Sequence, residues 1–531
     1  MFLDARGDLP SDTRIECDLC VMGAGAAGIT IARELASTGL SIYVLESGGL
    51  EFEDEIQALY KGTSIGHEYP ALDIARLRFF GGSTNHWEGS CHPLEAVDFE
   101  RRSWIAHSGW PITRSQLDPF YVRAQKYCGL GPFDYDAAHW VGKIAGKPLP
   151  LRADRVRTAI SQLSPPVRFG IDYRQDLETA AHVVVLLHAT VVDIIADPSN
   201  GQVSHVRFGE LGGKRFTLSA RAYVLALGGI ENPRLLLSSN GVHPNGLGNQ
   251  NDLVGRFFMD HPVVEGAILK PSDPKLDLSF YGVSDTQGSY RLNAHLELAD
   301  EVLRQEQLVN IGAPFIPRDR YYASPGIESY HDIANALAKG RLPPHLWGDI
   351  GDVARDFDMV VEASSRRLFG RRLFSSAEEL AYFGFDTMTE QTPNPESRVT
   401  LGDERDPFGM RRVKLDWRLS NSDKENLWRC YEVLGAELGR AGIGRVRLLR
   451  DREDALWTTR LSYGDHHMGT TRMSEDPRFG VVDADCRVHS VLNLYVAGSS
   501  VFPTGGHVPP TLTIVALAIR LADHLKSVFA V

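Results

Sequence analysis

Three glycines and one carboxylate near the start of the chain have the types and spacing of a dinucleotide-binding site. Gly23, Gly25 and Gly28 form the pattern G-x-G-x-x-G, and Glu46 follows 18 residues after the last of them. In such a turn the first glycine permits a tight bend, the second lets a pyrophosphate approach the backbone, and the third lets a helix pack on its strand. Glu46 would accept hydrogen bonds from a ribose diol, which favours FAD or NAD over NADP. The pattern alone does not distinguish FAD from NAD.

The glycine pattern stands between two apolar runs of strand length. Residues 17–22 form the first run, and residues 41–45, rich in β-branched and aromatic side chains, form the second. Between them Ile29 and Leu35 lie at helical spacing among alanines, and Gly39 marks the end of the helix. The stretch therefore predicts a strand, a glycine turn, a helix and a second strand. The helix N-terminus would offer free N–H groups and a positive dipole end to phosphates.

Composition excludes several classes of protein. A chain of 531 residues is too long for one ordinary core, so two domains are expected. A formal net charge of −12, with no basic block to offset it, argues against nucleic-acid binding. No apolar run reaches the ~18 residues of a membrane helix, so no membrane partner is expected. The polar, acidic start lacks the pattern of a signal peptide, which predicts a cytoplasmic protein.

Two of the six cysteines have a spacing that occurs in redox and metal sites. Cys17 and Cys20 spell C-x-x-C. Both lie within the first predicted strand, however, where packing of small apolar side chains accounts for them. We therefore expect them to be structural, and we expect no metal site in the chain.

A second strand-to-glycine turn is predicted later in the chain. Residues 223–227 are an apolar run, Gly228 and Gly229 follow, and a helix is expected to start near Glu231, with Pro233 in its first turn. We interpret this unit as a return of the chain to the dinucleotide sheet. It would place Gly228 close to the cofactor.

The C-terminal part of the chain shows the same succession of strand, glycine turn and helix. Residues 493–497 form a predicted strand that ends at Gly498, and a helix of good helix formers is expected over residues 511–526. Between residues 76 and 93 an irregular loop of small polar residues would wrap a flat ligand. Residues 385–420 are typical of hairpin strands, which suits a substrate domain built on an antiparallel sheet.

Together these segments resemble the glucose–methanol–choline (GMC) family of flavin oxidoreductases over nearly the whole length of the chain. The matching segments, in family order, are GAGAAG with Glu46, FFGGSTNHWEG, ALGGIENPRLLL, VGRFFMDHP, HHMGTTRM and LYVAGSSVFPTGG followed by PPTLTIVALAIRLADHL. The similarity is greatest to the bacterial branch of pyranose-oxidase-like and glycoside-oxidising members. The six segments describe a flavin site rather than a nicotinamide site, so the resemblance implies FAD.

The resemblance also implies the architecture, an α/β fold (α+β overall) with a discontinuous Rossmann-type FAD-binding domain. A substrate domain with an antiparallel sheet flanked by helices would cover the flavin. We assign residues 12–105, 180–265 and 455–531 to the FAD-binding domain, and residues 106–179 and 266–454 to the substrate domain.

In the family, a histidine three residues before the glycine of a Gly-Thr pair faces flavin N5 and takes the proton of the alcohol. That position is His466, before Gly469. A neutral histidine titrates near working pH and is a natural base. The resemblance therefore implies oxidation of a small-molecule alcohol, such as a sugar or glycoside CH–OH group, by hydride transfer to N5. Reoxidation would use O2 or a quinone or protein acceptor. His467 is a weaker candidate for a substrate contact.

One active-site position departs from the family. The Asn or His that usually precedes the Pro-Thr-Leu-Thr stretch is Pro509, which offers neither a side-chain donor nor an N–H. His507, two residues earlier, is a candidate to take over this role, and Asn85 could place an amide near N5 or the substrate. The alternative is a redox-neutral or repurposed flavoprotein, either a lyase or a binding subunit that kept its FAD.

The resemblance and the glycine turn together predict the cofactor contacts. His86 matches a position where some relatives attach FAD covalently, while others carry a similar loop without a link, and both possibilities stay open. Asp260 and His261 match a family segment that we interpret as structural. The predicted cofactor-binding residues are Gly23, Gly25, Ala26, Ala27, Gly28, Glu46, Ser47, Gly82, Ser83, Asn85, His86, Trp87, Val191, Gly228, Asp483, Gly498, Ser499, Pro510 and Thr511.

Overall fold

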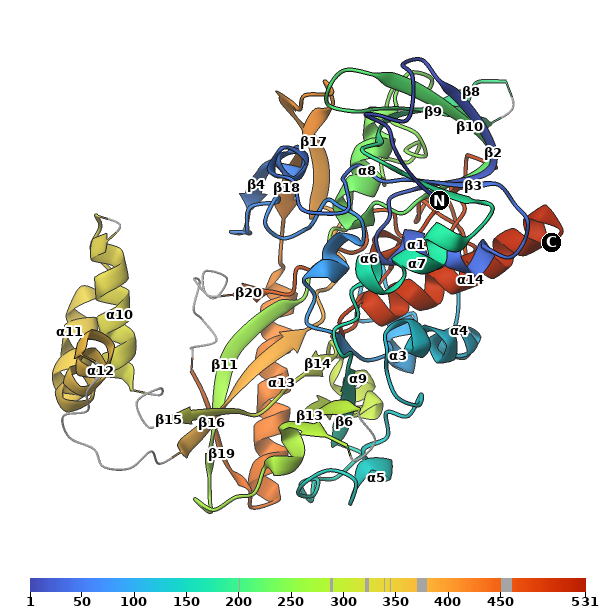
Figure 1. Ribbon diagram of the computed structural model, residues 1–531. Coiled ribbons are helices and arrows are strands. Elements are labelled where there is room, and N and C mark those ends of the chain that lie inside the picture. The colour runs from blue at the N-terminus through green and yellow to red at the C-terminus, as the bar shows by residue number, and fades with distance from the viewer. Residues whose placement is uncertain are drawn as a thin grey trace.

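The computed structural model describes residues 1–199, 201–286, 290–319, 324–338, 340–343, 345–369, 380–449 and 461–531. A largely parallel sheet with its helices lies at one end of the molecule, and antiparallel sheets lie at the other (Figure 1). The predicted boundary between residues 454 and 455 falls outside the described residues.

The first sheet has eight strands in the order β1-β7-β3-β2-β10-β9-β8, and β21 pairs with β10. In the sheet order, the neighbouring strands β1, β7, β3, β2 and β10 are all parallel, and β21 is parallel to β10. The start of β10 pairs antiparallel with β9, and β9 pairs antiparallel with β8. The strands are β1 (Phe2–Asp4), β2 (Arg14–Met22), β3 (Ile42–Leu45), β7 (Val183–Leu187), β8 (Thr190–Asp197), β9 (Gln202–Gly209), β10 (Arg215–Leu225) and β21 (Leu494–Val496).

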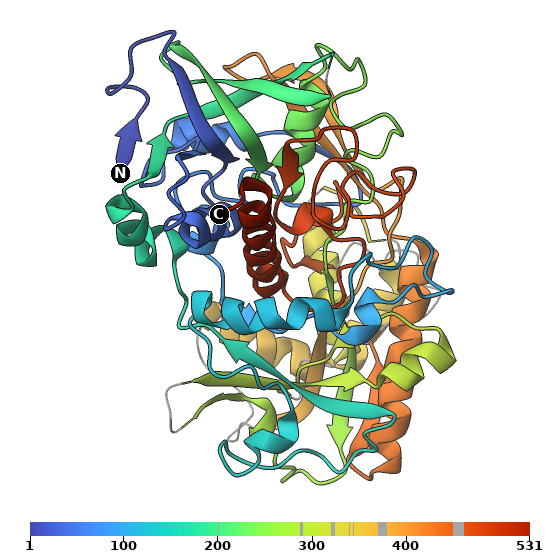
Figure 2. The same cartoon turned by 90° about the vertical axis from the view of Figure 1, so that its right-hand side faces the viewer.

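The parallel strands are apolar because both of their faces are covered. Residues 19–22 of β2 are fully buried, as expected for a central parallel strand. Helix α1 (Ala26–Leu35) packs on β2 and β3, and α14 (Thr511–Phe529) packs on α1 and α4 (Arg114–Tyr127). Figure 2 shows α14 in dark red between this sheet and α4. The predicted strand, turn, helix and strand at the N-terminus are confirmed.

Helix α8 (Gly228–Ser238) begins at Gly228, three residues before the predicted start. Pro233 therefore lies inside the helix rather than in its first turn. Because proline has no N–H, it cannot bond the carbonyl four residues earlier, which is that of Gly229. Thr470 satisfies this carbonyl instead, donating its hydroxyl at 2.6 Å. This hydrogen bond joins the segment GGIENP (residues 228–233) to the segment HHMGTT (residues 466–471).

Two antiparallel sheets form the other end of the molecule. A six-stranded sheet has the order β14-β16-β11-β19, with β15 paired to β16 and β20 to β11, and a four-stranded sheet has the order β12-β13-β6-β5. Helix α13 (Asn421–Arg440) packs on β11 and β19. The strands are β5 (Ser90–Cys91), β6 (Val156–Leu163), β11 (Pro262–Pro271), β12 (Val283–Asp285), β13 (Arg291–Leu298), β14 (Ile311–Gly312), β15 (Ile316–Asp319), β16 (Leu380–Thr389), β19 (Gly444–Leu448) and β20 (Ser462–Tyr463).

The predicted hairpin forms between β17 (Arg398–Arg405) and β18 (Arg411–Trp417). It does not join the large antiparallel sheet, because β18 pairs with β4 (Thr63–Gly66) and both strands contact α8. Both partners belong to segments assigned to the FAD-binding domain. The division into domains stays a prediction.

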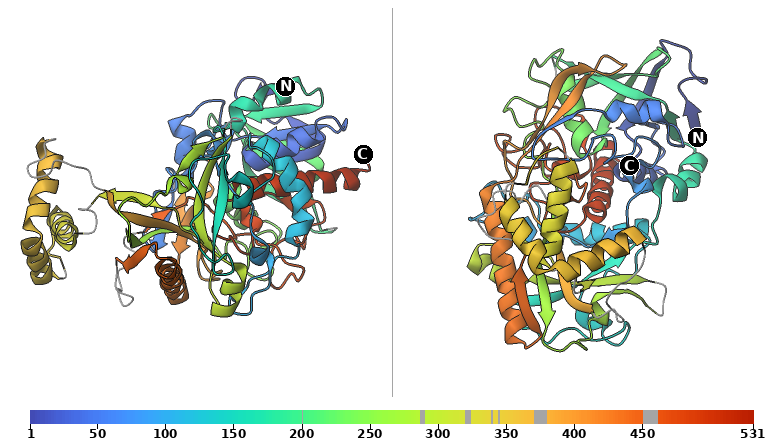
Figure 3. Two further views of the ribbon diagram at one scale, coloured as in Figure 1. Left: turned by 90° about the horizontal axis from the view of Figure 1, so that it is seen from below. Right: turned by 90° about the vertical axis from the view of Figure 1, so that its left-hand side faces the viewer.

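Three helices stand apart from the rest of the molecule in Figures 1 and 3: α10 (Pro325–Ala338), α11 (Leu346–Arg355) and α12 (Phe357–Phe369). The remaining helices are short: α2 (Asp54–Gln57), η1 (Ala58–Tyr60), η2 (Gly82–Asn85), α3 (Ala96–Phe99), α5 (Ala137–Trp140), α6 (Phe169–Asp172), α7 (Arg174–Thr179), η3 (Ser279–Tyr281), α9 (Asp300–Glu306) and η5 (Ser499–Val501). Among the described helices, none combines the length and apolar character needed to cross a bilayer.

Candidate active site

One cavity of about 1130 Å³ runs from the N-terminal glycine turn to the antiparallel sheets. Most of the predicted site residues line it, although they come from distant parts of the sequence. The predicted residues in its lining are Gly23, Gly25, Ala26, Ala27, Glu46, Ser47, Gly82, Ser83, His86, Trp87, Val191, Gly228, His466, Gly498, Ser499, His507, Pro510 and Thr511.

The three glycines of the turn have three different surroundings. Gly23 has φ +103°, and a Cβ there would lie 2.6 Å from the carbonyl oxygen of Ala226. A Cβ on Gly28 would lie 1.9 Å from the oxygen of Gly23, so Gly28 serves helix packing and does not itself line the cavity. A Cβ on Gly25 would meet no atom within 4 Å, because it would point into open space. This cradle fits a pyrophosphate close to the backbone.

Glu46 is held at the same end of the cavity. Its carboxylate accepts hydrogen bonds from the backbone N–H of Ala24 at 2.9 Å and of Gly48 at 3.0 Å. Burial raises the pKa of Glu46, while these two N–H groups oppose the rise. Each oxygen keeps a second lone pair, so the carboxylate can still accept hydrogen bonds from a ribose diol.

Two predicted cofactor contacts lie elsewhere. The Asn85 amide donates to the carbonyl oxygen of Phe80 at 2.9 Å, which ties the loop to itself. The Asp483 carboxylate accepts from the backbone N–H groups of Asp485 and Arg487, at 3.0 and 2.9 Å, and so closes a turn. Neither residue lines the cavity. The predicted flavin contacts of both residues, and the catalytic role of Asn85, therefore stay predictions.

A charged cluster at the cavity wall was missed by the sequence reasoning. Glu231 accepts ion pairs from Arg76 and Arg234 at 3.0 Å and from Arg78 at 3.3 Å. Burial alone would raise the pKa of Glu231, but the three guanidinium groups hold it at about 2. Arg78 also donates to Ser47 at 2.8 Å. Asp406 pairs with Arg234 at 2.7 Å, so three guanidinium groups face two carboxylates. The remaining positive charge beside the glycine turn suits the anionic part of a dinucleotide.

His466 lines the middle of the cavity and is part of a chain of hydrogen bonds. Its Nδ1 lies 2.8 Å from Nδ1 of His261, and Nε2 of His261 lies 2.9 Å from the carbonyl oxygen of Gly506. A carbonyl can only accept, so the proton of His261 is on Nε2. Burial lowers the pKa of His261 to about 4, which keeps that ring neutral at physiological pH.

The protonation of His261 determines the tautomer of His466. A neutral His261 with its proton on Nε2 can only accept at Nδ1, so His466 must donate from its own Nδ1. Nε2 of His466 is then left with a free lone pair, and among the described residues no group hydrogen-bonds to it. Burial, and then the neighbouring His261 and His467, hold the pKa of His466 well below its ordinary value. His466 is therefore neutral and presents an unprotonated ring nitrogen at the cavity.

Asp260 fixes the backbone beneath these two rings. Its Oδ1 accepts from the backbone N–H groups of His261 at 2.6 Å and of His466 at 2.8 Å, and Tyr69 donates its hydroxyl to Oδ2. The segment of Asp260 and His261 was interpreted as structural, yet it holds the predicted base. Its partner lies more than two hundred residues later in the chain, so no local signal could have indicated this contact.

His467 also faces the cavity, beside His466. Its ring packs between Tyr69 and Phe258, with centroids 6.0 and 5.8 Å away, and Nε2 has no hydrogen-bond partner among the described groups. Burial lowers the pKa of His467 to about 3. Its neutral ring nitrogen is available to a ligand, in keeping with the predicted substrate contact.

His507 lines the cavity on the side of the antiparallel sheets, together with Pro509. Nε2 of His507 lies 2.9 Å from Oε1 of Glu297, on β13, and this oxygen also lies 3.0 Å from Nε2 of His295. Nε2 of His507 thus approaches a buried carboxylate. Neither Glu297 nor His295 was expected in the site from the sequence.

Comparisons with known proteins decide what kind of cavity this is. Two models of the GMC oxidoreductase family match the chain, over residues 174–263 and 393–518. The chain belongs to the GMC oxidoreductase family. It is 26% identical to 6'''-hydroxyparomomycin C oxidase of Streptomyces lividus, over 96% of this chain and 92% of the relative. It is 22% identical to the fructose dehydrogenase large subunit of Gluconobacter japonicus, over 97% and 98% of the two chains.

The solved structure of a formate oxidase has the same fold, with a TM-score of 0.56 and 18% identity over 98% of this chain and 100% of that one. The predicted fold class is thereby confirmed. The family match and the relatives confirm the predicted flavin cofactor and enzyme class: the protein is an FAD-dependent oxidoreductase that acts on alcohol groups. The choice between FAD and NAD, left open by the glycine pattern, is thereby settled. The cytoplasmic location, the covalent link at His86 and the electron acceptor stay predictions.

Proposed function

We propose that this GMC oxidoreductase oxidises a CH–OH group of a polyhydroxylated substrate, such as a sugar, glycoside or aminoglycoside, with His466 as the base. The observation that carries the proposal is the chain from Gly506 through His261 to His466, which leaves a lone pair on His466 Nε2 at the cavity. FAD, when bound, supplies the hydride acceptor. The protein supplies the proton acceptor and the position of the substrate.

A base is required because loss of hydride from an alcohol carbon leaves a cation unless the hydroxyl proton departs as well. A neutral imidazole in a buried position accepts that proton without first losing one of its own. His466 has this state because burial disfavours its charged form.

The wall opposite the glycine turn supports a substrate with many hydroxyl groups. Arg291, Asn293 and His295 alternate along β13 and line the cavity, whereas Leu292 and Ala294 face the core. Asp386, on β16, also lines the cavity. These side chains provide both hydrogen-bond donors and acceptors. Two relatives are named for oxidation of paromomycin-type aminoglycosides and of fructose, which accords with this chemistry.

The test is anaerobic bleaching of the flavin absorbance in the purified holoenzyme, with sugars, glycosides, aminoglycosides and aromatic alcohols as candidate substrates. We expect one polyhydroxylated class to bleach the wild type, and His466→Asn to retain FAD but to be reduced about 10²–10⁴-fold more slowly. His139→Gln is the control, because His139 is an exposed histidine paired with Asp134 outside the cavity. Bleaching of His466→Asn at the wild-type rate would exclude His466 as the base.

The same preparations address the remaining predictions. Readmission of air after bleaching distinguishes an oxidase, whose colour returns rapidly, from a dehydrogenase, which needs a quinone or protein acceptor. Acid precipitation leaves the yellow colour with the protein if His86 carries a covalent flavin. Failure of every alcohol to bleach the bound flavin would favour the redox-neutral alternative, which no observation in the described structure supports.

A further inference from the structure

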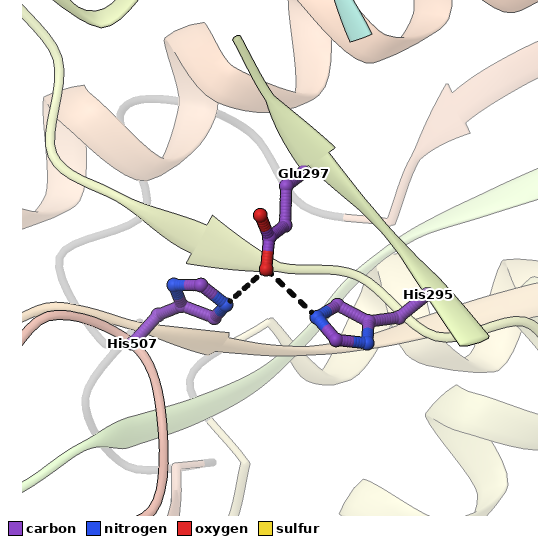
Figure 4. A group of neighbouring side chains, drawn as sticks. All are labelled: His295, Glu297 and His507. Atoms are coloured by element: carbon purple, nitrogen blue, oxygen red, sulfur yellow. Dashed lines mark hydrogen bonds and ion pairs between the residues drawn. The ribbon is translucent and has the colours of Figure 1, made fainter. Parts of the chain in front are cut away.

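Two imidazoles and one carboxylate converge in Figure 4, and both imidazoles belong to residues that line the cavity. Nε2 of His295 lies 3.0 Å, and Nε2 of His507 2.9 Å, from the same oxygen, Oε1 of Glu297. The side chain of Glu297 is completely buried, and those of His295 and His507 are 9% and 3% exposed. The three ligand atoms all lie within 4.8 Å of one another.

Hydrogen bonding accounts for only one of the two contacts, because Nε2 of His295 is hydrogen-bonded to Oε1 of Glu297 whereas His507 is not. Neither ring nitrogen of His507 makes a hydrogen bond of acceptable geometry with a described group, although Nε2 is 2.9 Å from the carboxylate. A buried polar nitrogen without a partner costs free energy, about 1–3 kcal/mol. In a tetrahedral zinc site with bonds of about 2.0–2.1 Å, ligand atoms are separated by about 3.3 Å. The two nitrogen–oxygen distances in the cluster, 3.0 and 2.9 Å, are slightly shorter than this value, and the two nitrogens lie within 4.8 Å of each other.

The surroundings hold the three ligands in place. Arg157, directly opposite Glu297 on β6, donates from Nε to Oε2 at 3.0 Å and so leaves Oε1 facing the imidazoles. A Cβ on Gly312 would lie 2.6 Å from Cδ2 and 3.1 Å from Nε2 of His507. Only a glycine in that place lets the ring approach the carboxylate.

The local charge also favours a cation. Arg157 is surrounded by three carboxylates: Glu297, with Nη2 at 2.9 Å, Asp300 at 3.3 Å and Glu95 at 3.4 Å. With neutral imidazoles, the negative charge of the carboxylates around Arg157 exceeds its single positive charge. A divalent ion at Glu297 would balance the remaining charge.

We propose that His295, Glu297 and His507 bind a divalent transition-metal ion of the zinc type at the wall of the cavity. Two histidines and one glutamate are a ligand set of zinc sites that keep a coordination position open. Because His295 and His507 line the cavity, that open position faces the substrate space and would take a hydroxyl oxygen of the substrate. Only this last role rests on the proposed function. Binding of the ion does not depend on it.

The proposal differs from the expectation that the chain has no metal site. His295 and Glu297 form an H-x-E pair, which is common on strands and carries no specific signal. His507 completes the set from a segment more than two hundred residues later. The expectation of no metal site rested on the spacing of cysteines. The three ligands proposed here are brought together only by the fold, so no local sequence pattern indicates them.

The test is the metal content of the holoenzyme, with any affinity tag removed, after incubation with Zn²⁺ and gel filtration. We expect the wild type to retain about one zinc ion per chain, and Glu297→Gln and His295→Gln to bind it at least ~10-fold more weakly. His139→Gln should bind like the wild type, because His139 is exposed and paired with Asp134. Flavin absorbance and the melting temperature show whether each variant is folded.

A second measurement needs no variant. X-ray absorption at the zinc edge should show nitrogen and oxygen neighbours at about 2.0–2.2 Å, with imidazole scattering from two rings. Wild-type protein that retains no Zn²⁺, Mn²⁺, Fe²⁺ or Co²⁺, or zinc bound equally by Glu297→Gln, would overturn the proposal. These measurements use no substrate, so failure of the proposed oxidation would not affect them. If the ion binds but leaves the substrate dependence of bleaching unchanged, only its role toward the substrate is wrong.

Discussion

The Nδ1 atoms of His261 and His466 lie 2.8 Å apart, and a single proton is shared between them. The carbonyl of Gly506 decides which ring carries it, since Nε2 of His261 must donate to that oxygen at 2.9 Å. His261 then accepts, His466 donates, and Nε2 of His466 remains unprotonated. A backbone carbonyl thus determines which nitrogen of His466, the proposed base, is protonated, and it does so through one intervening histidine.

This relationship predicts that two substitutions of His261 slow flavin reduction to very different extents. His261→Asn keeps an acceptor oxygen near the position of Nδ1, whereas His261→Gln keeps a donor near Gly506 but removes the acceptor. We expect flavin reduction to slow by about 10–100-fold in His261→Gln and by much less in His261→Asn. The measurement is the rate of anaerobic bleaching with saturating substrate.

The pH profile distinguishes this positioning role from a merely structural one. His261 contributes to the lowered pKa of His466, so its removal should raise that pKa. The acid limb of the rate of flavin reduction should move to higher pH in His261→Gln. Equal slowing of both variants, with an unchanged acid limb, would contradict the assigned tautomers.

The glycine turn predicts that two neighbouring glycines have separable effects. In Gly28→Ala, the new Cβ would lie 1.9 Å from a backbone oxygen, an overlap that no side-chain movement relieves. We expect it to cost more than about 3 kcal/mol of stability. In Gly25→Ala, the Cβ points into open space, so the fold should persist while a pyrophosphate is kept away from the backbone.

The measurements are the melting temperature without FAD and the FAD dissociation constant from flavin fluorescence. Gly25→Ala should melt near the wild type and bind FAD at least ~10-fold more weakly, which is about 1.4 kcal/mol. Unchanged FAD affinity in Gly25→Ala would mean that the pyrophosphate does not lie over this glycine.

The parts of the fold that the sequence predicted are local. Gly23 to Glu46 could be interpreted because strand, turn, helix and strand follow one another, and each glycine acts on neighbouring backbone. The start of α8 was placed three residues late because Pro233 usually marks a first turn. The hydroxyl of Thr470, which makes an interior proline acceptable, is remote in the sequence.

The active site was less predictable because its contacts join distant segments. His466 was found through the family resemblance, but its partner His261 was taken as structural, and Glu297 and His295 were not anticipated. Asn85 has the chemistry of a ligand contact, yet its amide bonds the carbonyl of Phe80. Spacing along a chain does not reveal which of several available partners a polar side chain will choose.

Buried neutral histidines predict how stability depends on pH. Burial lowers the pKa of His92 to about 3, well below the value of about 6.5 in an unfolded chain. The unfolded state therefore takes up the proton first. The contribution of His92 to the free energy of unfolding is complete above about pH 6.5. It is lost as the pH falls toward 4, by about 1.4 kcal/mol per pH unit.

His92→Asn removes this titration and keeps a donor near the carbonyl of Pro93, which Nδ1 contacts at 2.8 Å. The free energy of unfolding, measured with denaturant and EDTA between pH 7 and 4, should fall less steeply with acid than in the wild type. The difference between the two proteins isolates His92 from Glu95 and Asp98, whose pKa values burial raises to about 7 and about 8. Identical slopes would show that His92 is protonated in the folded state.

Two adjacent threonines provide the most closely matched comparison. Thr470 and Thr471 are both completely buried, but only Thr470 donates its hydroxyl, to the Gly229 carbonyl that Pro233 leaves free. Thr470→Val should lower the free energy of unfolding by about 1–3 kcal/mol, because a buried carbonyl loses its partner. Thr471→Val should be neutral or stabilising, since the Thr471 hydroxyl has no partner in the described structure.

Pro233→Ala restores an N–H four residues after Gly229, so it should reduce the cost of Thr470→Val in the double variant. Urea unfolding of the wild type and these four variants measures the coupling. Equal costs for the two valine variants would show that the hydroxyl of Thr470 does not stabilise α8.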